Sequence, residues 1–365
     1  PGPEMYTNTQ LFLIHSGLFF AAAVFSLLIN SLFLRFAHTL GIRDHGQLVR
    51  WSSTSKPAFG GIGFFIIFLG SFSVYSVLFP KLSDPLQPEL LGLLASTALV
   101  FLMGLADDAY NTRPLLKFGA QITCGILLIA SGTSIQIFDN VWADRVLTVT
   151  WVVGMMNSIN MLDNMDAIST VTALNILGCV LTVHLLSGDV SSVHMVIVVG
   201  VMAALAGFLF FNWNPSRMYM GDTGSQFLGV YLAWAGIHYF WNAKSPWEDS
   251  EPWRQAALTL VVFLLPICDT TAVTINRMLK GRSPFIGGRD HTTHYLGYAG
   301  LSDPQVALVY LGLGLLNVFL IFCSIKFIGS WRNLHTFIFV AYAVVIFGLL
   351  FALTKLRRTS GNKTD

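Results

Sequence analysis

The chain has 365 residues, of which 54% are hydrophobic and only 11% are charged. A soluble globular domain carries about 25% charged residues, so the composition excludes that class and predicts a polytopic membrane protein. The formal net charge of +2 gives no reason to expect nucleic acid or another polyanion as a partner.

Eleven apolar runs could form membrane-spanning helices, although the third and the fifth are short. In chain order they are 11–34, 58–79, 90–106, 115–132, 146–160, 167–187, 193–211, 223–241, 255–276, 304–327 and 334–354. We expect residues 1–4 to be a tag remnant and residues 5–365 to form one all-α integral membrane domain.

Lysine and arginine are distributed unequally between alternate connections. One set of connections starts with the one after the first run and includes every second connection from there and the C-terminal tail. This set carries 15 basic residues, whereas the other connections carry six. Because basic residues favour the cytoplasm, we expect the N-terminus outside and the C-terminus in the cytoplasm. This topology places seven aspartates on the cytoplasmic face, which favours an enzyme over a transporter with charges near mid-bilayer: Asp107, Asp108, Asp163, Asp166, Asp222, Asp269 and Asp290.

At the start of the run 58–79, Lys56 precedes the glycines Gly60 and Gly61. The glycines would permit close helix packing, whereas Lys56 could meet a phosphate or simply mark the cytoplasmic side.

Asp107 and Asp108 stand side by side at the end of the run 90–106. Two adjacent carboxylates need a cation if both are to be ionised; otherwise one pKa rises and that group becomes a base near neutrality. Either state suits divalent-metal chemistry. The alternative is a solvated helix end that pairs with Arg113 or Lys117.

Asn157, Asn160, Asp163 and Asp166 recur every three residues. Each step of three slips by about 60° around a helix, so the four side chains share one half of a helix or line a tight turn. This pattern favours a binding role, and a capped, water-exposed turn is the alternative.

Residues 220–225 open the run 223–241. Asp222 and Thr223 are ordinary helix N-cap residues, but free backbone N–H groups there could also bind phosphate while Asp222 holds a metal. Tyr219 could stack on a base or serve as an interfacial anchor.

The longest inner connection contains Arg289, His291 and His294. Two histidines three residues apart share a helix face, but a third zinc ligand at fixed spacing is missing. Histidine and arginine on the side of the carboxylates favour a pyrophosphate-binding role, and incidental residues of a basic loop are the alternative. Asp269 could orient this loop.

Taken in order, these motifs resemble the polyprenyl-phosphate N-acetylhexosamine-1-phosphate transferases of glycosyltransferase family 4 type, over residues 50–303. The resemblance rests on Gly60-Gly61, Asp107-Asp108, the 157–166 repeat, Asn212 with residues 220–225, and the histidine loop. It implies transfer of a sugar phosphate from a UDP-N-acetylhexosamine to undecaprenyl phosphate, with release of UMP. It also implies Mg²⁺, or alternatively Mn²⁺, as cofactor, and the bacterial cytoplasmic membrane as location.

The resemblance also implies roles for individual residues. Asp222 and Asp108 are expected as metal ligands, and one of Asp107 and Asp108 as the base or orienting group for the lipid phosphate. The catalytic set would be Asp107, Asp108, Asp222, His291 and His294. The substrate-binding set would be Asn157, Asn160, Asp163, Asp166, Asn212, Tyr219, Arg289 and Lys117.

Two departures from the family motifs bear on the branch. Residues 163–167 replace both glycines of the family's Asp-Gly-x-Asp-Gly, which predicts a stiffer loop, and residues 291–294 lack one histidine of His-x-His-His. Eleven spans, a basic tail and Gly-Gly-Arg-Asp-His resemble the WecA/TagO-like branch and imply UDP-GlcNAc. The alternatives are an MraY-type phospho-MurNAc-pentapeptide transferase and a cation-coupled transporter. The assembly state is open, with a homodimer as one alternative.

Overall fold

The computed structural model describes residues 6–37, 56–80, 87–243, 251–283 and 287–355, and in these ranges it contains helices and no strand. The expected tag remnant lies outside them. The elements are α1 (Asn8–Phe36), α2 (Gly60–Leu78), α3 (Pro88–Tyr110), α4 (Pro114–Ala130), α5 (Val141–Leu162), α6 (Ile168–Ser187), α7 (Val193–Asn212), α8 (Gly221–Gly236), the π-helix η1 (Ile237–Trp241), α9 (Pro252–Val262), α10 (Leu264–Leu279), α11 (Thr292–Tyr298), α12 (Asp303–Phe327) and α13 (Asn333–Leu353). The all-α class is therefore confirmed for the described residues.

Each apolar run expected to cross the membrane coincides with one helix or with two consecutive helices. Among the described residues, seven helices are long and apolar enough to cross, and α9 with α10, bent by 77°, makes eight if it counts as one span. The helices α4 and α8 fall short of this length, with 17 and 16 residues. The count of eleven spans and the orientation of the chain therefore stay predictions.

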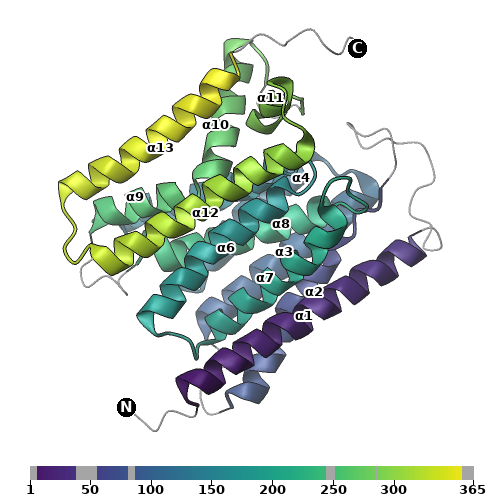
Figure 1. Ribbon diagram of the computed structural model, residues 1–365, viewed down its shortest axis with the longest axis vertical. Coiled ribbons are helices and arrows are strands. Elements are labelled where there is room, and N and C mark those ends of the chain that lie inside the picture. The colour runs from purple at the N-terminus through teal and green to yellow at the C-terminus, as the bar shows by residue number, and fades with distance from the viewer. Residues whose placement is uncertain (1–5, 38–55, 81–86, 244–250, 284–286, 356–365) are drawn as a thin grey trace.

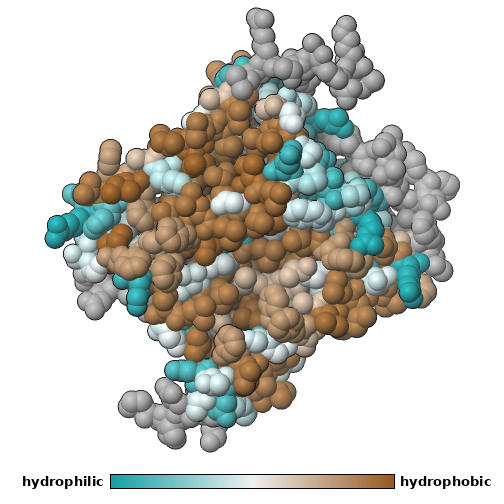
Figure 2. All heavy atoms as spheres, viewed as in Figure 1, coloured by the Kyte–Doolittle hydropathy of each residue, from teal (hydrophilic) through white to brown (hydrophobic). Residues whose placement is uncertain are grey.

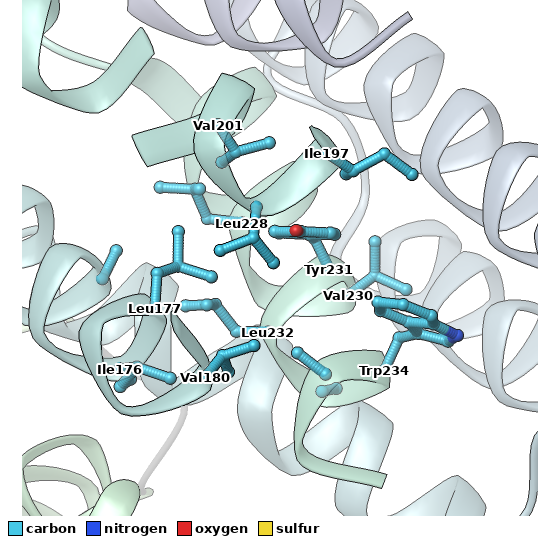
Figure 3. Close-up of a cluster of buried hydrophobic side chains, with 14 of the residues drawn as sticks. Ile176, Leu177, Val180, Ile197, Val201, Leu228, Val230, Tyr231, Leu232 and Trp234 are labelled. Atoms are coloured by element: carbon cyan, nitrogen blue, oxygen red, sulfur yellow. The ribbon is translucent and has the colours of Figure 1, made fainter. Parts of the chain in front are cut away.

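Helix α8 lies at the centre of the bundle and contacts α2, α3, α5 and α6. Every residue of α8 from Thr223 to Gly236 is buried. A helix that is apolar on all sides belongs in the interior of a protein. Figure 3 shows its side chains meeting those of α6 and α7, and the labelled residues are Ile176, Leu177, Val180, Ile197, Val201, Leu228, Val230, Tyr231, Leu232 and Trp234.

The outer helices present apolar side chains to their surroundings. On α1, Phe12 and Phe20 are 71% and 69% exposed, and on α13 Phe337 is 70% exposed. Figure 2 shows hydrophobic residues across the middle of the visible face, with hydrophilic residues gathered towards its ends. An apolar surface of this extent suits a lipid environment.

Two glycines bring α2 and α3 into backbone contact with the start of α8. A Cβ atom on Gly104 would lie 2.4 Å from Cα of Thr223, and one on Gly61 would lie 2.2 Å from the backbone nitrogen of Gly224. The Gly61 amide also donates to the carbonyl of Met220 at 3.0 Å. The Gly60-Gly61 motif therefore serves close packing, which was one of the two roles expected for that segment.

We predict that Gly104→Ala destabilises the protein, because the added methyl group would overlap the backbone of α8. Overpacking of this kind costs about 1–3 kcal/mol. Gly154→Ala on α5 is the matched control, since no atom lies within 4 Å of a Cβ there. Thermal unfolding in detergent measures both variants, and a Gly104→Ala protein as stable as the Gly154→Ala protein would contradict the packing described.

Candidate active site

The predicted site residues gather at one end of the helix bundle. Helices α3 and α5 end there, and α4 and α8 begin there. Figure 1 shows α3 and α8 between α1 on one side of the bundle and α12 and α13 on the other. Hydrogen bonds across these helix ends prove the proximity: Lys117 and Asn160 both donate to Asp222. A further bond, from Thr293 Oγ1 to Asn164 Oδ1 at 2.7 Å, joins the histidine loop to the α5–α6 turn.

Lys117 bridges two carboxylates at the centre of the site. Its Nζ lies 2.8 Å from Oδ2 of Asp107 and 3.0 Å from Oδ1 of Asp222. The other oxygen of Asp107 accepts from the backbone N–H and the hydroxyl of Thr112, at 2.8 and 2.6 Å. One ammonium group thus neutralises part of the charge of two acids, and the Asp222 side chain is 28% exposed.

Asp108 has a different environment from its neighbour Asp107. Its Oδ1 accepts from the backbone N–H of Asp222 at 2.8 Å, and its Oδ2 accepts from the backbone N–H and hydroxyl of Thr223 at 3.0 and 2.6 Å. A carboxylate at a helix N-terminus satisfies free N–H groups and interacts favourably with the helix dipole. Asp108, from α3, is therefore the cap of α8.

This cap corrects two expectations for the start of α8. The N-cap position is Met220, so Asp222 and Thr223 lie inside the first turn and do not cap the helix. The backbone N–H groups of Asp222 and Thr223 donate to Asp108. The sequence had suggested that these N–H groups are free to bind a phosphate. They are not free, because Asp108 already accepts from them.

Asn160 and Asn157 lie on the same face of α5 but in two successive layers. Nδ2 of Asn160 donates to Asp222 and, at 2.9 Å, to Oγ of Ser225. Nδ2 of Asn157 donates to Oε1 of Gln121 at 2.8 Å. Asn160 therefore belongs to the charged centre, whereas Asn157 lies one helical turn farther from the bundle end.

Asp163 follows the last residue of α5 and is partly exposed. Loss of solvation, with the negative charges of Asp222, Asp108 and Asp166 nearby, raises its pKa from 3.8 to about 7. A carboxyl group poised near neutrality can hold or release a proton at physiological pH.

Asp166 and Asn212 are held by the protein itself. Asp166 accepts from the backbone N–H and hydroxyl of Ser216, at 2.9 and 2.7 Å, and from Nδ2 of Asn214 at 3.0 Å. The side-chain amide of Asn212 accepts from the Thr170 hydroxyl at 2.7 Å, donates to the carbonyl of Met218 at 3.2 Å and is 2% exposed. Both residues thus fix the turn between α7 and α8, and a role in binding substrate stays a prediction.

Lys56 and Tyr219 lie together beside this turn. Nζ of Lys56 donates to the Ser216 hydroxyl at 2.9 Å and lies 5.1 Å from the ring centroid of Tyr219. The Tyr219 amide donates to the carbonyl of Pro57 at 3.0 Å. A cation over an aromatic face is favourable, so the pair keeps a positive charge and a ring near the site.

At position 167 this chain has alanine where the family motif has glycine, and this difference affects the backbone. Ala167 takes a left-handed backbone conformation, with φ of 67°, immediately before α6. Alanine is strained in that region where glycine is not. The Ala167 amide donates to Oδ1 of Asn212 at 3.2 Å, which holds the turn in place.

His291 is oriented by a buried carboxylate on α10. Its Nδ1 lies 2.8 Å from Oδ2 of Asp269, and the other oxygen of Asp269 accepts from the backbone N–H and hydroxyl of Thr292, at 2.8 and 2.6 Å. A carboxylate accepts only, so Nδ1 carries a proton and donates to Asp269. Asp269 therefore orients the loop, as one reading of the sequence suggested.

The rest of the loop is arranged around this pair. Burial and the charge of His291 lower the pKa of His294 to about 4, so His294 is neutral at pH 7. Arg277 donates to both oxygens of Asp290, at 2.9 and 2.6 Å. The hydrogen bond and charge of Arg277 hold the pKa of Asp290 below its usual value despite burial. Arg289 is exposed.

The site has the carboxylate that a magnesium ion requires. Among the described residues, no three or more His, Cys, Asp or Glu side chains are grouped to hold a metal ion. Magnesium in phosphate-transferring enzymes needs fewer protein ligands, because one or two carboxylates, substrate phosphates and water complete its shell. Asp222 fits this requirement better than Asp108, both of whose oxygens contact α8.

Sequence comparisons relate the chain to known proteins. The family model described as "Glycosyl transferase family 4" matches residues 90–240, which run from α3 through η1. The "Probable undecaprenyl-phosphate N-acetylglucosaminyl 1-phosphate transferase" of Bacillus subtilis (strain 168) is 24% identical over 332 residues, which cover 88% of this chain and 86% of the relative.

Two further relatives carry related names. The "Decaprenyl-phosphate N-acetylglucosaminephosphotransferase" of Mycobacterium tuberculosis (strain ATCC 25618 / H37Rv) is 28% identical over 72% of this chain and 70% of the relative. The "Phospho-N-acetylmuramoyl-pentapeptide-transferase" of Listeria welshimeri is 26% identical over 78% of this chain and 89% of the relative. The resemblance found in the motifs is thereby confirmed at the level of the superfamily.

We predict that Asp163 makes stability depend on pH. Between its ordinary pKa of 3.8 and its folded value of about 7, the folded protein holds a proton that the unfolded chain has lost. The free energy of unfolding therefore falls as pH rises through this window. Asp163→Asn removes the titrating group, so its melting temperature should fall less from pH 4 to pH 8 than that of the wild type.

Asp139→Asn, at an exposed position outside the site, is the control and should follow the wild-type profile. If Asp163→Asn and wild type lose stability in parallel, Asp163 does not hold the proton.

Proposed function

Because the chain belongs to the polyprenyl-phosphate N-acetylhexosamine-1-phosphate transferase superfamily, we propose that it transfers GlcNAc-1-phosphate from UDP-GlcNAc to undecaprenyl phosphate. A phosphate oxygen of the lipid bonds to the sugar-bearing phosphorus, the bond from that phosphorus to the bridging oxygen breaks, and UMP leaves. The products are UMP and the lipid-linked sugar diphosphate, as in the first membrane step of cell-surface glycan assembly.

One observation carries this proposal: Lys117 lies between Asp107 and Asp222 at the end of the bundle, within hydrogen-bonding distance of both. Two phosphate-bearing substrates must approach each other although both are anionic. Catalysis of phosphoryl transfer consists largely of positioning and of neutralising such charge. A lysine and a metal-binding carboxylate side by side supply those two functions.

We propose that the carboxylates have different roles in the reaction. Asp222 would hold Mg²⁺, which when bound neutralises charge on the diphosphate and on the departing UMP. Asp107 orients Lys117, and of the two adjacent acids it is better placed for the lipid phosphate, because Asp108 is engaged in capping α8. His291, oriented by Asp269, would donate from a protonated Nε2 to the diphosphate from the opposite loop.

We also propose that eleven segments cross the bacterial cytoplasmic membrane, with the site on its cytoplasmic side. In a background without the four native cysteines, a membrane-impermeant thiol reagent added to intact cells should label Asp189→Cys, on the α6–α7 connection. It should not label Arg113→Cys, on the α3–α4 connection. The reverse pattern would invert the topology.

We predict that the purified protein releases UMP from UDP-GlcNAc only with undecaprenyl phosphate and Mg²⁺ present. Asp222→Ala should lower kcat by about 100-fold or more, since loss of a charge-stabilising group in a transition state costs 10²–10³. The measurement is UMP release at saturating lipid over a range of Mg²⁺ concentrations. Substantial activity in the Asp222→Ala variant would show that Asp222 is not the metal ligand.

The choice of sugar nucleotide separates the two branches of the superfamily. UDP-GlcNAc and UDP-MurNAc-pentapeptide are compared under the same conditions, and we expect turnover of the first. Turnover of the muramoyl substrate alone would assign the reaction of the Listeria relative instead. Accumulation of an ion in sealed vesicles without UMP release would favour a transporter.

A further inference from the structure

A second polar layer lies one helical turn farther into the bundle than the pair of Lys117 and Asp222. Gln121 follows Lys117 by four residues on α4, and Gln226 follows Asp222 by four residues on α8. Residues four apart share a helix face. Each glutamine therefore lies one helical turn below one of the two charged residues.

The side-chain amides of this layer join three helices. Nε2 of Gln121 donates to Oε1 of Gln226 at 3.0 Å, and Oε1 of Gln121 accepts from Nδ2 of Asn157 at 2.8 Å. Gln121 and Gln226 are each 2% exposed. The layer thus connects α8 to α4 and α4 to α5. The charged layer above it connects the same three helices through Lys117, Asp222 and Asn160.

Only one half of the Gln226 amide takes part in the layer. Its Oε1 accepts from Gln121, whereas its Nε2 is buried and, among the described residues, has no hydrogen-bond partner. A buried amide N–H without a partner costs about 1–3 kcal/mol. Gln226 therefore contributes the acceptor oxygen for Gln121. Without that oxygen, Nε2 of Gln121 would keep only its longer bond, 3.4 Å, to Oδ1 of Asn157.

We propose that Gln121 and Gln226 are positioning residues for the reaction, an inference that rests on the proposed function. They touch no substrate. Their hydrogen bond fixes α4 against α8, and thereby holds Nζ of Lys117 between Asp107 and Asp222. Without it, the first turn of α4 can shift relative to α8, and a displacement of about 1 Å in such a site can cost a hundredfold in rate.

The test compares two substitutions at position 226. Gln226→Leu removes the acceptor at similar volume. Gln226→Glu keeps it: in apolar surroundings the acid is neutral, and its carbonyl oxygen can accept from Gln121. We expect kcat for UMP release, per folded protein, to fall about 10- to 100-fold in Gln226→Leu, as for outer-shell partners of metal sites. In Gln226→Glu it should stay close to the wild type, with KM changed little in both.

Two results would overturn the proposal. Either Gln226→Leu keeps the wild-type kcat, or Gln226→Glu is as impaired as Gln226→Leu, so that the acceptor oxygen makes no difference. Gln255→Leu on α9 is the matched control, because Gln255 is also 2% exposed and stands outside both layers. It should lower thermal stability and leave kcat per folded protein unchanged.

A thermal double-mutant cycle tests the layer without catalysis. If Gln121 and Gln226 interact, the loss of melting temperature in Gln121→Leu/Gln226→Leu should be smaller than the sum of the two single losses. If the losses of melting temperature are additive, the two glutamines do not interact and the proposed layer does not exist. Failure of the wild type to release UMP would refute the proposed function instead, and the cycle would still report on the contact.

Discussion

The arrangement of the whole site depends on how four charged groups are compensated at the end of an apolar bundle. Asp107, Asp108 and Asp222 place three negative charges close together, against the single ammonium of Lys117. Unpaired charge in such surroundings costs several kcal/mol. The remaining compensation comes from the start of α8, whose N–H groups and dipole bind Asp108. A helix start is thus used as a fixed partial positive charge.

This compensation explains why α3 and α8 must touch at the backbone. Asp108 reaches the N–H groups of α8 only if the two helices approach closely, and the glycine at position 104 permits that approach. Successive residues on a helix point about 100° apart, so Asp107 on the same turn faces α4 instead. Two adjacent and chemically identical residues therefore acquire different functions from helix geometry alone: one caps a helix and the other holds a lysine.

Much of this could be predicted from the sequence, and the failures have physical causes. Hydropathy located the helices, and the positions of the acids at the ends of apolar runs placed them at one end of the bundle. The capping of α8 by Asp108 was missed because it depends on tertiary contact between α3 and α8. Gln121 and Gln226 were missed because a single amide hardly changes the mean hydropathy of an apolar helix. Their spacing of four residues from Lys117 and Asp222 could have indicated that they share a helix face with the charged residues.

Hydrogen bonds divide several of the predicted catalytic and substrate-binding residues into two groups. Asp166 accepts a hydrogen bond from Ser216 and Asn212 donates one to the carbonyl of Met218, both in the α7–α8 turn, and a ligand would have to displace those partners. The second group consists of Asp163, with its pKa near 7, and the neutral His294, whose buried Nδ1 has no partner among the described residues. We therefore expect the second group to contribute more to substrate recognition, because a ligand would add interactions there. A ligand that bound to the first group would only replace hydrogen bonds that already exist, and the turn that precedes Asp222 would lose its support.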